Sequence, residues 1–298
     1  MSVTLWRFVD GKAGHDVQSQ GLVAALQERL EVSVFDIPVD KNVSGFWSWL
    51  TAGYAPGRDL PAPDLLLGAG HATHWHLLAA RRQWGGRIIL LMKPTLPVAC
   101  FDLCLVPEHD GLSPAANVVT TRGVLNGFRS GGEHDADTGL ILLGGRSRHY
   151  RWKDGDILSQ LERLIRERPV KRWLLTTSPR TPESLLQSFV GRLNVEITPY
   201  APGTRDWLAD RLAEAGEVWV TEDSVSMIYE ALTAGARVGL LKVQRSHSNR
   251  ITAGVDALVQ DGWVGTPGRL QLAAGPVRPL NEAQRCADWI KKHWLTNH

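Results

Sequence analysis

The sequence predicts an α/β protein made of two successive domains, each a doubly wound parallel sheet covered by helices. The 298 residues exceed what one hydrophobic core usually organises, and 43% of them are hydrophobic. Short β-branched or leucine-rich runs alternate with helical patterns, which is typical of parallel sheets. Residues 123–138 interrupt this alternation with Gly, Ser, Asp and His. We therefore expect a first domain over 1–130 and a second over 138–279.

The alternation defines the elements of each domain. In the first domain we expect strands at 3–10, 32–37, 64–68, 87–92, 103–107 and 118–121, with helices at 17–30 and 72–84. In the second we expect strands at 139–143, 172–177, 195–197, 218–221 and 238–241, with helices at 155–168, 182–190, 204–215 and 224–234. A last helix at 282–294 follows a proline-rich stretch, and we expect the segment 280–298 to pack back on the first domain.

Composition excludes several classes of protein. The formal net charge is only +2 and no run of Lys and Arg stands out, so nucleic acid is not an expected partner. The cysteines Cys100, Cys104 and Cys286 are too few for a disulfide framework, which together with the lack of a signal-peptide pattern indicates a cytoplasmic protein. No apolar run approaches the ~20 residues of a membrane-spanning helix, so any contact with the inner membrane face should be peripheral.

The turn after the first strand is the first candidate for chemistry. Ligands of open parallel sheets bind beyond the carboxyl ends of the strands. Gly11 and Gly14 let the backbone approach a ligand, Lys12 supplies a cation, and the next helix offers free N–H groups. His15 can act as a general base, with Asp16 beside it. The plainer alternative is that His15 and Asp16 only cap the helix.

Two further turns of the first domain carry histidines. Gly70 and His71 follow a strand and precede a helix, but the dinucleotide-binding spacing G-x-G-x-x-G is incomplete. His74 and His76 lie within that helix with no carboxylate or cysteine beside them to complete a zinc site, so we expect no metal. Glu108 and His109 end another strand and could handle protons, although a solvated turn is an equal alternative.

The second domain carries a pattern suited to phosphate. Gly144, Gly145 and Arg146 follow its first strand, and the next strand ends at a hydroxyl-rich turn with Ser178 and Arg180. Glycines clear space and arginines supply fixed positive charge, so two such turns on one sheet favour an anion site over two unrelated surface turns.

The helix at 224–234 completes this predicted site. Thr221, Ser224 and Ser226 place hydroxyls around the helix start, where free N–H groups favour phosphate. Glu230 lies one turn beyond Ser226 on the same face, within reach of ribose hydroxyls. The alternative is an ordinary capped helix. The carboxylates of residues 222 and 223 would repel phosphate, so they should turn outward or bind something else, such as the acceptor or a divalent ion.

Taken together, seven segments resemble the mitochondrial-fission Elm family of plants and bacteria. They are DGKAGHDVQSQGL, GAGHATH, VPEHDG, NVVTTRG, GGRSRHYRW, TTSPRTP and VTEDSVSMIYEALTAG, which run from residue 10 to about residue 235. The resemblance implies a glycosyltransferase B fold, two facing Rossmann-like domains with a cleft between them. The implied fold is similar to that of the enzyme that adds N-acetylglucosamine to the peptidoglycan lipid intermediate.

The resemblance also implies roles for residues. His15 would be the catalytic base, and the donor nucleotide would lie on the second domain against the residues Gly144, Gly145, Arg146, Ser178, Arg180, Ser224, Ser226 and Glu230. The first turn holds fewer glycines than is usual for such enzymes, so Lys12 could have a role of its own.

Three functions remain open at this point. The first is a glycosyltransferase that uses a nucleotide sugar, needs no cofactor or metal, and acts on a lipid-linked or saccharide acceptor. The second is a nucleoside-diphosphate-sugar epimerase; its common NAD-dependent form would need a dinucleotide fingerprint and a Tyr-x-x-x-Lys pair, which the four tyrosines do not form. The third is a non-catalytic recruitment module of the mitochondrial-fission type.

Overall fold

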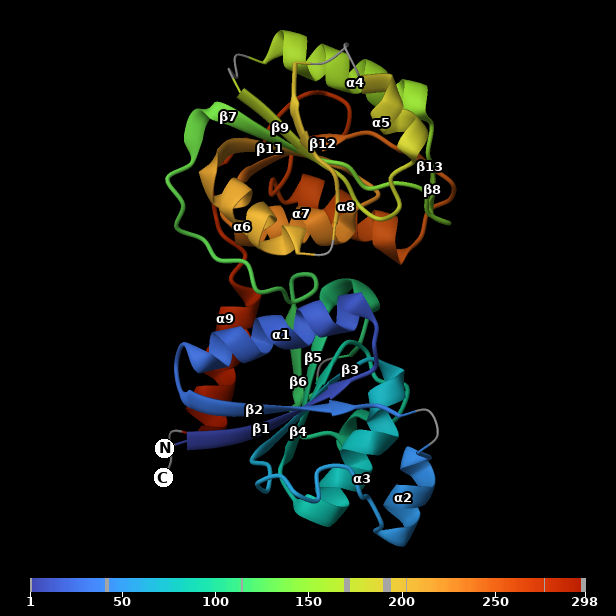
Figure 1. Ribbon diagram of the computed structural model, residues 1–298, viewed down its shortest axis with the longest axis vertical. Coiled ribbons are helices and arrows are strands. Elements are labelled where there is room, and N and C mark those ends of the chain that lie inside the picture. The colour runs from blue at the N-terminus through green and yellow to red at the C-terminus, as the bar shows by residue number, and fades with distance from the viewer. Residues whose placement is uncertain are drawn as a thin grey trace. The chain divides into compact units, whose positions relative to one another are not determined.

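The computed structural model describes residues 2–40, 43–113, 115–168, 172–189, 194–201, 203–275 and 277–295. The chain divides into two compact units (Figure 1). Unit 1 comprises Met1–Gly127 and Asn281–His298, and unit 2 comprises Phe128–Leu280. Each unit is built on a parallel sheet with helices on both faces, which confirms the predicted fold class of two Rossmann-like domains.

Unit 1 contains a six-stranded sheet in the order β2-β1-β3-β4-β5-β6, with every pair parallel. Its strands are β1 (Ser2–Val9), β2 (Glu31–Pro38), β3 (Leu65–Ala69), β4 (Arg87–Leu91), β5 (Leu103–Pro107) and β6 (Val118–Thr121). Its α-helices are α1 (Ala13–Gln27), α2 (Gly45–Thr51), α3 (His74–Trp84) and α9 (Glu282–Ile290). Single 3-10 turns occupy His71–Thr73, Val98–Cys100 and Glu108–Asp110, and a π-helical turn, Lys291–Leu295, extends α9.

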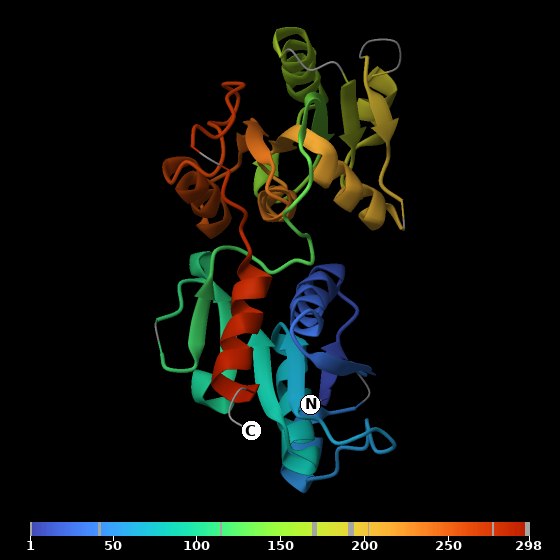
Figure 2. The same ribbon diagram turned by 90° about the vertical axis from the view of Figure 1, so that its left-hand side faces the viewer.

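Strand residues alternate between the two faces of this sheet, so each face has its own core. On one face Leu5 and Leu67 pack with Leu26 of α1 and Cys286 of α9. On the other face Phe8 and neighbouring strand residues pack with α3. Helix α9 lies beside α1 (Figure 2), and Arg29 at the end of α1 pairs with Asp288 of α9. The C-terminal helix therefore belongs to the core of unit 1.

Unit 2 contains a five-stranded parallel sheet in the order β10-β9-β7-β11-β12. Its strands are β7 (Asp135–Leu142), β9 (Arg172–Thr176), β10 (Glu196–Thr198), β11 (Ala215–Thr221) and β12 (Arg237–Leu241). Two further strands, β8 (Tyr150–Arg151) and β13 (Gln244–Arg245), form a separate antiparallel pair. Helices α4 (Asp154–Glu167) and α5 (Glu183–Phe189) cover one face, and α6 (Thr204–Glu214), α7 (Val225–Thr233) and α8 (Arg250–Gln260) lie on the other side (Figure 1).

Two tryptophans of the unit 2 sheet pack over glycines of the neighbouring strands. Trp173 pairs in register with Gly139, and Trp219 pairs with Gly239. A Cβ atom on either glycine would overlap the indole of its partner. Both indoles are buried, at 4% and 0% exposed, so they fill space that any larger residue on the neighbouring strand would take from them.

Several predicted boundaries were wrong, and some elements were missed. Helix α1 begins at Ala13, four residues before the predicted start, and β7 begins at Asp135, inside the segment that we had expected to be irregular. Elements α8, β8 and β13 were not predicted. The predicted helix end at residue 190 lies outside the described residues.

Candidate functional site

Each sheet has one topological switch point, where the strand order reverses direction. In unit 1 the chain leaves β1 for β2 on one side and later adds β3 to β6 on the other. In unit 2 it leaves β7 for β9 and β10, and then adds β11 and β12 on the opposite side. Ligands of doubly wound folds bind beyond the carboxyl ends of the strands at such points. The turns after β1, β3, β7 and β11 are therefore the places where the fold itself favours a site.

The turn after β1 contains an aspartate–histidine pair. The Nδ1 atom of His15 lies 2.9 Å from Oδ2 of Asp10, whose side chain is only 3% exposed. Burial would raise the pKa of Asp10, but hydrogen bonds from the Lys12 backbone N–H and from the His15 ring, with the charges of both residues, lower it below its ordinary value. Asp10 is therefore an ionised acceptor, so Nδ1 of His15 carries the proton and Nε2 keeps a lone pair.

The turn after β3 supports the His15 ring. Gly70 has a φ of +77°, and a Cβ atom at this position would overlap Cε1 of His15. Only glycine both accepts this backbone conformation and leaves room for the imidazole. The structure thus brings together the first two turns that the sequence singled out, and Asp10 is the functional residue that the sequence reasoning did not select.

The other predicted residues of this turn occupy the first turn of α1. Because the helix begins at Ala13, Gly14 and His15 are helical, and the backbone carbonyl of Lys12 accepts from the N–H groups of His15 and Asp16. Lys12 makes an ion pair with Asp10 at 3.4 Å, and Gly11 takes a φ of +76°. Asp16 was predicted to stand beside His15 in catalysis. The carboxylate that the His15 ring contacts is instead that of Asp10.

The remaining candidates of unit 1 lie further along the same sheet edge. His71 is exposed. Glu108 and His109 follow β5, which β4 separates from β3. The carboxylate of Glu108 lies 4.0 Å from Arg122, and His109 lies 4.0 Å from Asp110. These two residues are paired within their own region and are not assembled around His15.

The three predicted turns of unit 2 lie together. The Gly144 N–H donates to the Thr221 hydroxyl at 2.7 Å, and the Ser178 hydroxyl donates to the Gly144 carbonyl at 2.7 Å. The Arg180 guanidinium donates to the carbonyls of Gly145 and Arg146, both at 3.2 Å. Hydroxyls that we expected to hold phosphate therefore also tie the loops to one another.

A buried carboxylate lies at the centre of this arrangement. Asp223 accepts from the Gly145 N–H at 2.9 Å and from Arg180 at 3.1 Å, and a Cβ atom on Gly144 would overlap its carboxylate. Burial raises the pKa of Asp223 in spite of these donors. Glu222 is buried too, bound by Arg245 and the Val243 N–H. Of the two alternatives for these carboxylates, turning outward was wrong, because arginines and backbone donors compensate their burial. The other alternative, that one of them binds the acceptor or a divalent ion, stays a prediction.

The start of α7 has no side-chain cap, and Thr221 and Ser224 beside it are buried, at 0% and 3% exposed. Ser224 is the N-cap residue, yet its side chain makes no capping hydrogen bond. The first N–H groups of a helix have no partner within the helix, and its dipole favours an anion there. Ser226 is exposed and Glu230 is half-buried on the same helix face. Arg146 is exposed as well. Ser226 and Arg146 are therefore the two predicted side chains that we expect a phosphorylated ligand to reach at the edge of the Asp223 cluster.

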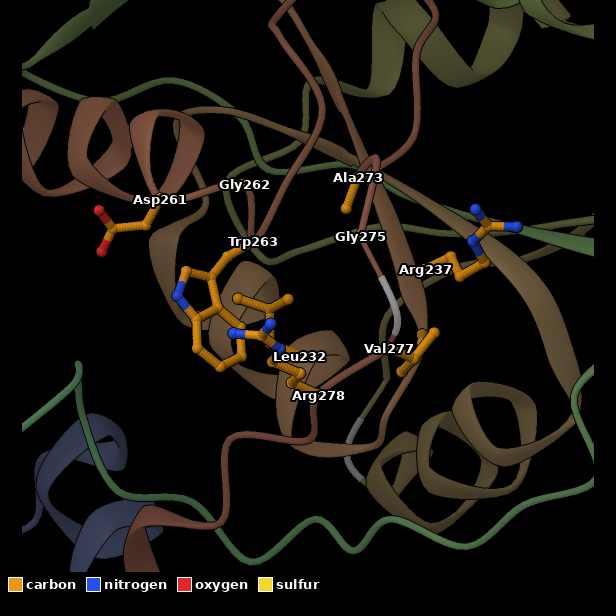
Figure 3. A pocket seen from close by; sticks show the side chains of 10 residues that line it. Leu232, Arg237, Asp261, Gly262, Trp263, Ala273, Gly275, Val277 and Arg278 are labelled. Atoms are coloured by element: carbon orange, nitrogen blue, oxygen red, sulfur yellow. The ribbon is translucent and has the colours of Figure 1, made fainter.

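A pocket of about 130 Å³ lies elsewhere in unit 2, at the amino end of β12 (Figure 3). Trp263, Arg278, Leu232 and Val277 are among its lining residues. Since ligands of parallel sheets bind at the carboxyl ends of the strands, we do not place the donor site there. Within the described residues, no cluster of three or more His, Cys, Asp or Glu side chains could hold a metal ion, and no helix is long and apolar enough to cross a membrane.

Fold and site together define a protein of two Rossmann-like domains of the glycosyltransferase B type, with a polar switch point in each domain. The chain belongs to the mitochondrial fission ELM1 family, whose model matches residues 13–294. A relative in Rickettsia prowazekii, the uncharacterized protein RP120, is 19% identical over 280 residues, which cover 77% of this chain and 79% of the relative.

Solved structures with the same fold come from two groups of proteins. A Listeria monocytogenes protein described as a UDP-N-acetylglucosamine 2-epimerase has a TM-score of 0.59 at 14% identity and covers 100% of this chain and 98% of its own. UDP-GlcNAc 2-epimerase from Neisseria meningitidis, bound to UDP-GlcNAc, has a TM-score of 0.55 at 12% identity and covers both chains fully. MurG from Acinetobacter baumannii has a TM-score of 0.54 at 14% identity and covers 97% and 99% of the two chains.

Proposed function

We propose that the protein is a glycosyltransferase that moves a sugar from a nucleoside-diphosphate donor to a lipid-linked or cell-envelope saccharide acceptor. The observation that carries this proposal is the Asp10–His15 pair, held against Gly70 at the switch point of unit 1. A histidine whose Nδ1–H is bound by an ionised carboxylate has its Nε2 lone pair free for a proton. Such a group suits removal of a proton from an acceptor hydroxyl.

In the proposed reaction the acceptor oxygen bonds to the anomeric carbon of the donor sugar. His15 takes the hydroxyl proton, the bond from the anomeric carbon to the diphosphate oxygen breaks, and its electron pair leaves with the nucleoside diphosphate. Asp10 stabilises the imidazolium that forms, as a positioning residue that does not itself take the proton. General base catalysis of this kind contributes about 10²–10⁴-fold to a rate.

Unit 2 supplies the proposed donor site. The uncapped start of α7 and Arg146 provide positive potential for the diphosphate, and Glu230 is placed to accept from ribose hydroxyls. These groups suffice to stabilise the departing charge, so we propose that no metal or other cofactor is required. The shared fold with MurG and with a UDP-GlcNAc-bound epimerase supports a nucleotide sugar as ligand.

Helix α2 supports a lipid-linked acceptor. Phe46, Trp47 and Leu50 are 41%, 61% and 48% exposed, an unusual concentration of large apolar side chains for a seven-residue helix. Tryptophan and phenylalanine favour the boundary between lipid headgroups and acyl chains. We propose peripheral contact of α2 with the inner face of the membrane, in the cytoplasm.

Product analysis tests the proposal. The protein is incubated with a panel of nucleotide sugars, with and without membrane lipid extract, and mass spectrometry follows the sugar and the nucleotide. We expect release of nucleoside diphosphate and appearance of the sugar on a lipid or saccharide, both lost in His15→Ala. Inversion of a sugar stereocentre with the nucleotide retained would indicate an epimerase instead. No conversion, together with unchanged cellular function of His15→Ala, would indicate a recruitment module.

A further inference from the structure

Two basic loops of unit 2 are joined next to the proposed donor site. Residues 146–149 follow β7, and residues 245–250 lead into α8. The Ser246 N–H donates to the His149 carbonyl at 2.9 Å, and the rings of His149 and His247 lie 5.9 Å apart. Strands β8 and β13, which adjoin the two loops, pair with each other. The two loops therefore form one structural feature, of which only the arginines of the first loop, Arg146 and Arg148, were predicted to favour phosphate.

The His149 ring is surrounded by hydrogen-bond donors. Nε of Arg148 donates to Nε2 of His149 at 3.0 Å, and Nδ2 of Asn249 lies 3.3 Å from Nδ1. The orientation of Asn249 is fixed, because its Oδ1 caps α8 by accepting from the N–H groups of Ile251 and Thr252. A neutral imidazole has only one acceptor nitrogen. Nδ2 of Asn249 has a second acceptor in the His247 carbonyl, 3.5 Å away. The cluster is rich in donors, which suits an acceptor from outside the chain.

The charges around His149 have one sign. Burial, and after it the nearby Arg148, His247 and Arg250, lower the pKa of His149. Two carboxylates of this region are already bound, since Arg245 holds both Glu222 and Asp256. Asp223 is held by Arg180. An anion that entered the cluster would relieve the repulsion and favour protonation of His149.

We propose that Arg148, His149, His247 and Arg250 form a proton-linked site for the terminal phosphoryl group of a diphosphate, and that the departing nucleoside diphosphate is held there. This inference rests on the proposed function. When the glycosidic oxygen bond breaks, its electron pair stays on the diphosphate, whose new terminal phosphate has its second ionisation near a pKa of about 6. The leaving group gains negative charge, and His149 takes up a proton from solvent to match it. Product release is then slower at lower pH.

Inorganic pyrophosphate is the probe for this site in the full chain. Calorimetric titrations at pH 7 in two buffers of different ionisation enthalpy give the number of protons taken up on binding. Wild type is compared with the double variant His149→Gln, His247→Gln, so that the ligand's own protons cancel in the difference. We expect wild type to take up about half a proton more than the double variant and to bind about tenfold tighter. His293→Gln, in the C-terminal helix of unit 1, is the control and should match wild type.

Equal proton uptake in wild type and the double variant, or no binding of pyrophosphate to wild type, would overturn the inference. The outcome separates the two proposals. If pyrophosphate binds with histidine-dependent proton uptake but no nucleotide sugar is bound or converted, the phosphate site stands and the proposed function falls. If a nucleotide sugar is converted and neither its affinity nor its proton uptake depends on the two histidines, the function stands and the inference falls.

Discussion

At the scale of single residues, the chemistry of unit 1 depends on the Asp10–His15 contact. Asp10 ends the first strand, and the sequence shows it as one more polar residue of a glycine-containing turn. Its role follows from burial: a carboxylate that is 3% exposed and bound to Nδ1 fixes both the orientation and the tautomer of His15. Residue spacing alone could suggest His15 but could not show which of Asp10 and Asp16 the ring contacts.

The first prediction concerns this contact. In Asp10→Asn the amide can donate to Nδ1, so the ring can place its proton on Nε2 and lose its function as a base. We expect sugar transfer to fall about 10²–10⁴-fold while donor affinity stays unchanged, measured by steady-state kinetics and by calorimetry. Asp16→Asn is the matched control and should keep most of the activity. Equal losses in the two variants would contradict the role of Asp10.

The second prediction concerns a buried histidine that the mechanism does not use. His74 is 1% exposed, its Nδ1 lies 3.2 Å from the Thr95 hydroxyl, and within the described residues its Nε2 has no partner. Burial, assisted by His71, lowers its pKa to about 4. The unfolded chain binds this proton near pH 6.5 and the folded chain only near pH 4, so His74 costs stability as the pH falls through this interval.

Urea unfolding measures this effect. Between pH 7 and pH 5 we expect wild type to lose about 2 kcal/mol more than His74→Gln, which has no titrating ring. A solvent-exposed histidine would give no such difference. The same loss of stability in both proteins would show that His74 is protonated in the folded state.

At the scale of elements, long periodic segments were predictable and short or locally stabilised ones were not. The six strands of unit 1 follow from their apolar runs. Helix α2 has only seven residues and exposes much of its apolar surface, so periodicity could not set its bounds. Helix α8 was missed although Asn249 and Thr252 form a capping box at its start. Helix α1 begins at Ala13 without a side-chain cap, since the bonds from the His15 and Asp16 N–H groups to the Lys12 carbonyl are ordinary hydrogen bonds of the first helical turn.

The third prediction concerns α2 and its exposed side chains. We expect the protein to float with vesicles that contain bacterial lipids, and Trp47→Ala to reduce the bound fraction severalfold, because the indole is 61% exposed and would leave the lipid boundary. Tyr200→Ala removes another exposed aromatic ring, 51% exposed in unit 2, and should bind like wild type. Equal binding by both variants would exclude α2 as the contact.

At the scale of the whole molecule, the chain crosses twice between its two units. Unit 1 is completed by a segment from the C-terminus, and Cys286, Ala287 and Ile290 of α9 are almost fully buried in its core. The sequence pattern predicted that the last helix would return to the first domain. It could not predict that ion pairs of unit 2 with a buried carboxylate, such as Asp223 with Arg180, would lie inside the proposed donor region, because pairing depends on the sheet order.

The fourth prediction follows from this connection. A fragment of residues 1–127 should be unfolded or aggregated, since it exposes the apolar face that α9 covers. Adding a synthetic peptide of residues 281–298 should restore a cooperative thermal transition, and the peptide with Ile290→Asp should not. A folded fragment without the peptide, seen by circular dichroism and NMR dispersion, would contradict the assignment of α9 to the core of unit 1.

The most direct test of the central claim is a calorimetric titration of the full chain with nucleoside diphosphates and their sugars. We predict that one nucleotide class binds, that Glu230→Gln weakens it about tenfold or more through the lost charged hydrogen bond to ribose, and that His15→Ala leaves it unchanged. If no nucleotide binds wild type, or if Glu230→Gln binds as tightly as wild type, a donor site at the start of α7 is contradicted.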